Sequence, residues 1–238
     1  STVRVDKRGP LGIAEGLIVE SSKFGGRWIA DAAKAGQEAR LAELLVAAAL
    51  EGASTRWPDA LAVAGIDGQQ PTELAKATAG VLGILAGRPG TGKTYTLAAL
   101  IRALGARRIA VCAPTGKAAV RATESLARNG LTMQATTIHR LLGVESADGG
   151  WQFKHTAANP LPMDFIIVDE SSMIDVPLMA SLLDARPAGC HVLFVGDPDQ
   201  LSPVGHGAPL RDMMAAGVLY GLLTEIRRNS GQIVRTCK

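Results

Sequence analysis

Four runs of apolar residues recur along the chain, and each ends in glycine, proline or an acidic residue. They lie at residues 81–87 (VLGILAG), 108–114 (RIAVCAP), 165–170 (FIIVDE) and 191–197 (HVLFVGD). Because nearly every position in these runs is apolar, we expect strands that are buried on both faces, as in a parallel sheet. Helical stretches follow the first three runs, at about 93–104, 116–128 and 176–184. This alternation predicts an α/β fold in which helices cover both faces of a parallel sheet.

The first 65 residues follow a different pattern. Residues 27–52 are rich in alanine and leucine and contain few helix breakers, which predicts one long helix or two. A glycine-rich stretch at 65–70 indicates a connection. We therefore divide the chain into a small, mostly helical N-terminal segment at 1–65 and an α/β domain at 66–238.

A further segment interrupts the α/β domain between its second and third strand–helix units. Two short runs, LGVES and WQFKH, flank Asp148-Gly149-Gly150. Glycine-containing turns of this kind join the strands of hairpins, so we expect an inserted β-hairpin at 144–158. The pattern leaves open whether this hairpin has a role of its own or is only a surface excursion.

Composition and charge place only weak limits on the kind of core and on the class of partner. Hydrophobic residues make up 47% of the chain and aromatic residues 4%, so the core must be mainly aliphatic. The formal net charge is +3 and the isoelectric point is about 8.9. Such a mild excess of positive charge is compatible with a nucleic-acid partner and equally with ordinary solubility.

The chain has three cysteines, Cys112, Cys190 and Cys237, without a CxxC pair or the spacing of metal ligands. Cys112 and Cys190 lie in or beside apolar runs, where a cysteine is commonly a small core residue. We expect a reducing compartment, the cytoplasm, with neither disulfides nor zinc. No apolar run reaches the ~18 residues of a membrane span, and no signal peptide is visible. Since the sequence begins without Met, we also expect a segment of a longer protein.

The first chemical motif is GRPGTGKT at 87–94, which matches G-x-x-x-x-G-K-[ST] between a predicted strand and a predicted helix. Glycines let successive backbone N–H groups face one anion, and the helix N-terminus adds positive potential. In such a loop Lys93 reaches the β- and γ-phosphates of a nucleotide and the Thr94 hydroxyl coordinates Mg²⁺. The expected nucleotide-binding residues here are Gly87, Pro89, Gly90, Thr91, Gly92, Lys93, Thr94 and Tyr95.

The second motif is the acidic pair that ends the run FIIVDE. Because parallel strands carry their last residues to one edge of the sheet, we expect Asp169 and Glu170 beside the phosphate loop. Asp169 can hold the Mg²⁺ ion, and Glu170 can accept a proton from an attacking water. Two adjacent acids suit hydrolysis of ATP by water and argue against a nucleotide kinase. We also find no Asn-Lys-x-Asp base reader of a GTPase.

The third motif is VGDPDQLSPVG at 195–205, which follows the fourth apolar run. Its Gln200 carries an amide that can both donate and accept, so it can distinguish ATP from ADP. Pro198 and Pro203 limit the flexibility of the loop, so that a shift at Gln200 would move the loop as a unit.

Six blocks in this order resemble the motifs of RecD-type superfamily 1B DNA helicases. The blocks are GRPGTGKT (87–94), CAPTGKAA (112–119), TTIHRLL (136–142), IIVDESSMID (166–175), LFVGDPDQLSPVGHG (193–207) and LTEIRRNSGQI (223–233). The resemblance implies the RecA-like P-loop domain that forms the N-terminal motor of such enzymes. It implies ATP and Mg²⁺ as ligands and 5′-to-3′ unwinding of DNA. Single-stranded and forked duplex DNA are the implied partners, with membership of a larger repair, replication or conjugation complex.

The resemblance also implies roles for single residues. Gln70 lies 17 positions before Gly87 and resembles an adenine-reading glutamine, and Arg228 resembles an arginine that contacts the γ-phosphate. The implied catalytic set is Lys93, Asp169, Glu170, Gln200 and Arg228. The implied DNA contacts are Pro114, Thr115, Gly116, Lys117, Thr137 and His139. The hairpin occupies the place of the pin that splits duplex DNA in this family.

For some of these residues the pattern itself supports two interpretations. Thr115 and Lys117 begin a predicted helix after a strand, which suits a phosphate site and equally a simple helix cap. Trp151 and Phe153 could stack on a base or merely pack within the hairpin.

Two departures from the family pattern change the expectation. Asn229 follows Arg228 where many relatives have glutamine, and the sequence ends at Lys238, before the motifs of a second motor domain. Because these helicases bind ATP between two such domains, we expect this piece alone to hydrolyse ATP poorly. A non-motor module or accessory subunit that binds ATP and DNA is the alternative.

Overall fold

The computed structural model describes residues 3–4, 18–21, 28–51, 63–147, 150–200 and 203–226. Arg228, Cys237 and the Asp148-Gly149 part of the hairpin turn lie outside the described residues.

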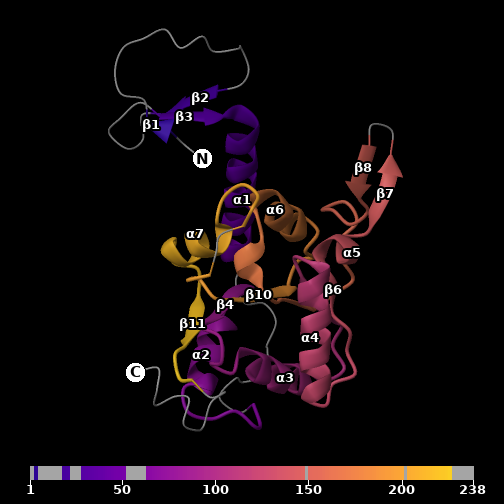
Figure 1. Cartoon of the computed structure of the whole chain (residues 1–238). Helices are drawn as coiled ribbons and strands as arrows, with labels where there is room; N and C mark the ends of the chain where they lie inside the picture. The colour runs from indigo at the N-terminus through magenta and orange to yellow at the C-terminus, as the bar shows by residue number, and fades with distance from the viewer. Residues whose placement is uncertain are drawn as a thin grey trace.

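A six-stranded parallel sheet forms the centre of the molecule (Figure 1). Its strands, in spatial order, are β11 (Tyr220–Leu223), β4 (Leu82–Gly87), β10 (His191–Gly196), β9 (Phe165–Val168), β5 (Ile109–Ala113) and β6 (Thr136–Thr137). The four strands predicted from apolar runs are confirmed and occupy the middle of this order. The two edge strands, β6 and β11, were not predicted. This strand order, with helices on both faces, is the predicted RecA-like α/β fold.

Helices cover both faces of the sheet, as predicted. One face carries α2 (Gln70–Ala77), α3 (Lys93–Leu104) and the end of α4 (Gly116–Arg128). The other carries α1 (Ala32–Glu51), α5 (Ile138–Leu142), α6 (Val176–Asp184) and α7 (Pro209–Ala215). Successive side chains of β10 point to opposite faces of the sheet. Val192 and Phe194 pack on the face that carries α1 and α6, and Leu193 and Val195 pack on the face that carries α2 and α3. All four are fully buried, which explains the uninterrupted apolar run.

The N-terminal segment contains strands that the sequence pattern did not predict. β1 (Val3–Arg4), β3 (Trp28–Asp31) and β2 (Ile18–Ser21) pair as an antiparallel sheet in that order. The predicted helix is confirmed as the single helix α1, but its predicted start at residue 27 is wrong. Asp31 stops the strand and caps the helix, because its Oδ1 accepts from the N–H groups of Ala33 and Lys34 at 2.9 and 3.2 Å.

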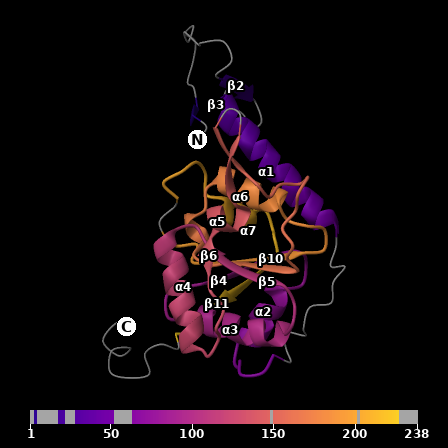
Figure 2. The same ribbon diagram turned by 90° about the vertical axis from the view of Figure 1, so that its right-hand side faces the viewer.

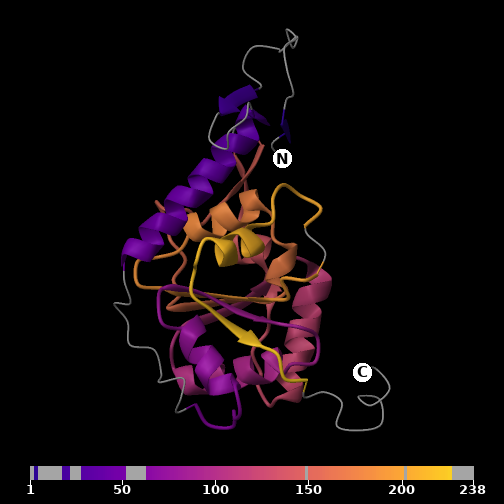
Figure 3. The same ribbon diagram turned by 90° about the vertical axis from the view of Figure 1, so that its left-hand side faces the viewer.

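Helix α1 lies diagonally along the face that carries α6 (Figures 2 and 3). Its Leu41 and Ala48 belong to the same apolar cluster as α6. Glu51, at its end, pairs with Arg186 and also accepts from the Gly189 N–H, and hydrogen bonding to Arg186 lowers the Glu51 pKa. This helix therefore shares the core of the α/β domain, although the division at residue 65 separates the two in sequence.

The predicted β-hairpin is confirmed. β7 (Val144–Ala147) and β8 (Gly150–Phe153) pair in antiparallel fashion and project away from the body of the molecule (Figure 1). Trp151 is 79% exposed, so it does not pack against the described body of the domain. Phe153 contacts the ring of His139 in α5, at 5.7 Å between centroids, and so anchors the base of the hairpin.

Cys112 and Cys190 are both buried free thiols, which confirms their prediction as core residues. Burial raises the pKa of the Cys190 thiol to about 12, so it stays protonated at neutral pH. No helix among the described residues has the length and apolar character that would let it cross a membrane.

Candidate nucleotide-binding site

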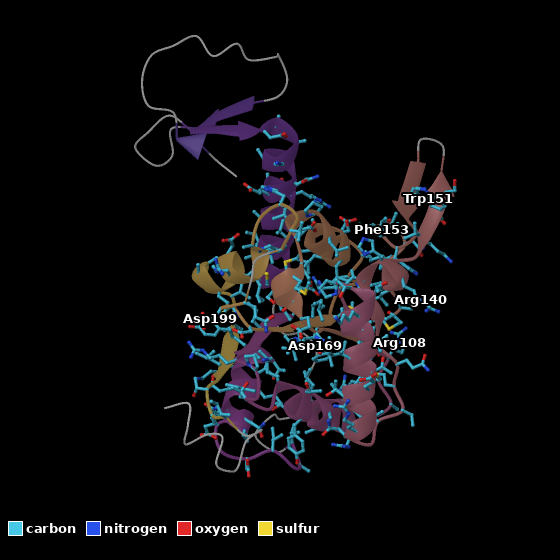
Figure 4. All side chains as sticks on the ribbon, viewed as in Figure 1. Arg108, Arg140, Trp151, Phe153, Asp169 and Asp199 are labelled. Atoms are coloured by element: carbon cyan, nitrogen blue, oxygen red, sulfur yellow. The ribbon has the colours of Figure 1, made fainter. Side chains whose placement is uncertain are left out.

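A cleft of about 610 Å³ opens at the carboxyl ends of the central strands. Most of the predicted nucleotide and catalytic residues line it: Gln70, Pro89, Gly90, Gly92, Lys93, Thr94, Tyr95, Asp169, Glu170 and Gln200. Other lining residues were not predicted: Gly65, Asp67, Ser125, Arg128 and Asn129. The structure therefore brings the three separate motifs to one place, as the parallel sheet requires. Figure 4 labels Asp169, which follows the central strand β9 and lies near the middle of the molecule.

The phosphate loop takes its shape from glycines in the left-handed region. Gly90 and Gly92 have φ angles of 87° and 86°, which other residues rarely adopt. Gly87 permits a close approach, since a Cβ there would lie 2.7 Å from Thr91 Oγ1. Gly92 is the N-cap of α3 and offers no side-chain cap, so the first N–H groups of the helix remain available to an anion. Gly87 and Thr91 thus shape the loop from behind, without lining the cleft.

Lys93 is held by the loop itself. Its Nζ donates to the carbonyl oxygens of Gly87 and Arg88, at 2.5 and 3.1 Å. Burial lowers the pKa of Lys93, and the nearby carboxylates of Asp197, Asp169 and Glu170 oppose this effect. An ammonium in this position can leave carbonyl groups for phosphate oxygens, which are stronger partners because they are charged.

The acidic pair follows β9 directly. The backbone N–H of Asp169 donates to Cys112 O at 2.8 Å, and Asp169 Oδ1 accepts from the Glu170 N–H at 2.9 Å. Burial raises the pKa of Asp169, and the Glu170 charge adds to this, whereas Lys93 lowers it. Glu170 has a φ angle of 52° and is, among the described residues, the one non-glycine residue with positive φ. Backbone strain of this kind concentrates at functional sites.

The loop that carries Gln200 is held from both sides. Asp197 is buried and its Oδ1 accepts from the Asp199 N–H at 3.0 Å, while Gln200 N donates to Asp197 O at 3.1 Å. Asp199 pairs with Arg88 of the phosphate loop at 3.2 Å. Sequence reasoning missed Asp197 and Asp199, although both stand in the motif that it singled out. Their signal was the turn-forming pattern Asp-Pro-Asp.

Gln70 is the clearest candidate for contact with a base. Its side chain is completely buried at the start of α2, yet it borders the cleft. Neither its Oε1 nor its Nε2 has a hydrogen-bond partner among the described residues. A buried amide without partners is unfavourable, and a ligand that offers one donor and one acceptor would satisfy it. An adenine edge is one group that offers both.

The residues expected to contact DNA lie at the carboxyl ends of β5 and β6. These strands are neighbours in register, with Ala113 opposite Thr137. Thr115 caps α4 by accepting from Ala118 N at 3.2 Å, and Thr137 caps α5 by accepting from Arg140 N at 3.1 Å. The capping interpretation is therefore confirmed for Thr115, and Thr137 caps its helix in the same way, although the sequence pattern did not predict this. Each hydroxyl still has its own hydrogen to donate, so phosphate contacts remain a prediction.

Comparison with known proteins places these motifs in context. A family model described as "AAA domain" matches residues 70–206. The RecBCD enzyme subunit RecD of Mycolicibacterium smegmatis is 44% identical over 153 residues, which are 56% of this chain and 27% of that protein. The ATP-dependent RecD2 DNA helicase of Deinococcus radiodurans is 42% identical over 171 residues, 71% of this chain and 22% of that protein. The chain thus spans about a quarter of the length of these relatives.

Among solved structures, Bacteroides Pif1 bound to single-stranded DNA is similar with a TM-score of 0.41 and 23% identity. The similarity covers 62% of this chain and 39% of that one.

Proposed function

Because the chain belongs to the AAA domain family, we propose that it is the first motor domain of an ATP-dependent DNA helicase similar to RecD. The observation that carries the proposal is the convergence of Lys93, the acidic pair and Gln200 in one cleft with the buried amide of Gln70. The two relatives at 44% and 42% identity support helicase chemistry.

In this proposal each side chain of the cleft has a separate task. Lys93 exchanges the carbonyl oxygens of Gly87 and Arg88 for β- and γ-phosphate oxygens. Glu170 accepts the proton of the attacking water. Gln200 hydrogen-bonds the γ-phosphate or that water, so that its position depends on which nucleotide is bound. Arg228 supplies a further positive charge.

The proposed metal is Mg²⁺, held by Thr94 and Asp169. Hydroxyl and carboxylate oxygens are the donors that this hard cation prefers. No group of three or more His, Cys, Asp or Glu side chains in the described part of the chain could hold a metal alone. That fits an ion that takes few protein ligands and completes its shell with phosphate oxygens and water. When bound, the ion neutralises charge on the phosphates.

DNA lies, in this proposal, across the same edge of the sheet as the nucleotide. The helix starts at Thr115 and Thr137 present N–H groups and hydroxyls to single-strand phosphates, with Lys117 and His139 beside them. Pro114 and Gly116 shape the first of these loops. Contacts to phosphates read no sequence, as a motor that moves along DNA requires. The proposed direction is 5′ to 3′, and the proposed partners include forked DNA and the other subunits of a repair, replication or conjugation complex.

Two measurements test this proposal. A fluorescent ATP analogue should bind the 238-residue chain in the presence of Mg²⁺, and the Lys93→Ala variant should not bind it. The protein extended to its natural C-terminus should then hydrolyse ATP faster when single-stranded DNA is added. If the extended protein binds both ligands without faster hydrolysis, it is a non-motor binding module. If the wild-type chain fails to bind the analogue, the assignment of the cleft is wrong.

A further inference from the structure

A second, much smaller cavity of about 10 Å³ lies beside the nucleotide cleft, close to the least space that one water molecule needs. It is lined by Ser172, Pro198, Gln200, Ala208, Leu210 and Arg211. Among the described residues that line either space, Gln200 alone borders both. Gln200, a half-buried residue, therefore lies between the nucleotide cleft and this cavity.

Ser172 presents an unsatisfied polar group to the small cavity. The residue is 8% exposed, and its Oγ has no hydrogen-bond partner among the described residues. Buried hydroxyls in proteins nearly always have a partner. Pro198, Ala208 and Leu210 offer no polar side chain, and the Arg211 guanidinium donates to Pro198 O at 3.2 Å. A guanidinium can only donate, so among the residues that line the cavity the Gln200 amide alone has a side-chain oxygen that can accept from the Ser172 hydroxyl.

Close packing fixes Ser172 relative to the loop that carries Gln200. Ser172 belongs to the short 3₁₀ helix η2 (Ser171–Met173), which begins directly after the strained Glu170. A Cβ added to Gly196, at the end of β10, would lie 2.8 Å from Ser171 Oγ and 3.1 Å from Ser172 N. The 3₁₀ helix thus packs directly against the end of the strand that leads into the Gln200 loop.

We propose that the Gln200 amide has two positions, one in the nucleotide cleft and one hydrogen-bonded to Ser172. Ser172 is then a positioning residue that competes with nucleotide for Gln200. Ser172 lies two residues after Glu170. A hydrogen bond between Gln200 and Ser172 would therefore couple the position of the Gln200 side chain to the backbone that follows the acidic pair. This inference rests on the proposed function of the cleft as an ATP site. It adds Ser172 as a second hydrogen-bond partner for Gln200, the side chain proposed to distinguish ATP from ADP.

The test is the affinity of the 238-residue chain for a fluorescent ATP analogue. Ser172→Ala should tighten binding of the analogue about two- to tenfold. In this variant the nucleotide no longer has to break a hydrogen bond between Gln200 and Ser172, and the factor corresponds to the strength of one such bond. Ser171→Ala is the matched control, because Ser171 Oγ is also buried without a partner among the described residues but does not line the cavity. That variant should bind as the wild type does. Ser172→Cys, which nearly keeps the volume but weakens the bond, should shift affinity in the same direction as Ser172→Ala.

A double-mutant cycle separates this role from a merely structural one. In a Gln200→Ala background, Ser172→Ala should leave the affinity unchanged, because the serine then has no amide to hold. Unchanged or weaker binding of the Ser172→Ala variant, or an equal effect with and without Gln200, would overturn the inference. A wild-type chain that does not bind the analogue would instead overturn the proposed function on which the inference rests.

Discussion

Substitution of Gln70 by methionine should stabilise the protein and at the same time weaken its selectivity for ATP. The amide Oε1 and Nε2 are both buried without partners among the described residues. Methionine has a similar length and shape but no amide, so the variant removes both unsatisfied atoms. Each such atom destabilises a folded protein by about 1–3 kcal/mol. Allowing for imperfect packing of the new side chain, we expect the free energy of unfolding without nucleotide to rise by about 1–3 kcal/mol.

Urea unfolding in the absence of nucleotide measures the first effect, as a higher midpoint at an unchanged slope. Competition of ATP and GTP against a fluorescent analogue measures the second, and the preference for ATP should fall roughly tenfold with the loss of the hydrogen bonds to the base. Gln69→Met is the matched control. Gln69 lies one residue earlier and bonds Thr224 at 3.0 Å, so its replacement should destabilise the protein and leave selectivity unchanged. A destabilised Gln70→Met variant that still prefers ATP would refute the role of Gln70.

Three further predictions concern charged groups. Lys93→Ala should abolish binding of an ATP analogue in equilibrium titration, and tight binding would remove Lys93 from the phosphate site. Glu170→Gln in the protein extended to its natural C-terminus should bind ATP normally and lose turnover in a steady-state ATPase assay; undiminished hydrolysis would exclude Glu170 as the base. Glu51→Gln should lower the free energy of unfolding at pH 7 by about 3 kcal/mol, because it leaves the largely buried Arg186 unpaired. The Glu51 pKa is lowered in the folded protein, so this stabilisation is present above the ordinary value of 4.5 and is lost as pH falls below it. Urea unfolding at several pH values should show the two proteins converge in acid, and a difference that persists there would refute the ion-pair explanation.

Strands and motifs that depend on local pattern could be predicted. The four central strands are buried on both faces, so each is a continuous apolar run that the sequence displays directly. The edge strand β11 escaped prediction because only alternate residues of Tyr220–Leu223 are buried. It pairs with β4, and Glu73 adds a further contact, since its Oε2 accepts from Leu222 N at 2.7 Å across 149 positions of sequence. No local pattern signals such a contact.

The sequence by itself determined the strand–helix alternation, the phosphate loop and the acidic pair, because glycine, lysine and carboxylate positions in that loop and strand have fixed local geometry. The tertiary structure alone decided that Gln70 is fully buried while it borders the cleft, that Glu170 has a strained backbone, and that Gln200 separates two spaces. These features depend on how β4, β9 and β10 bring distant segments together at one edge of the sheet. Burial and the lack of a partner are properties of that packing, and they have no signature in the order of the residues.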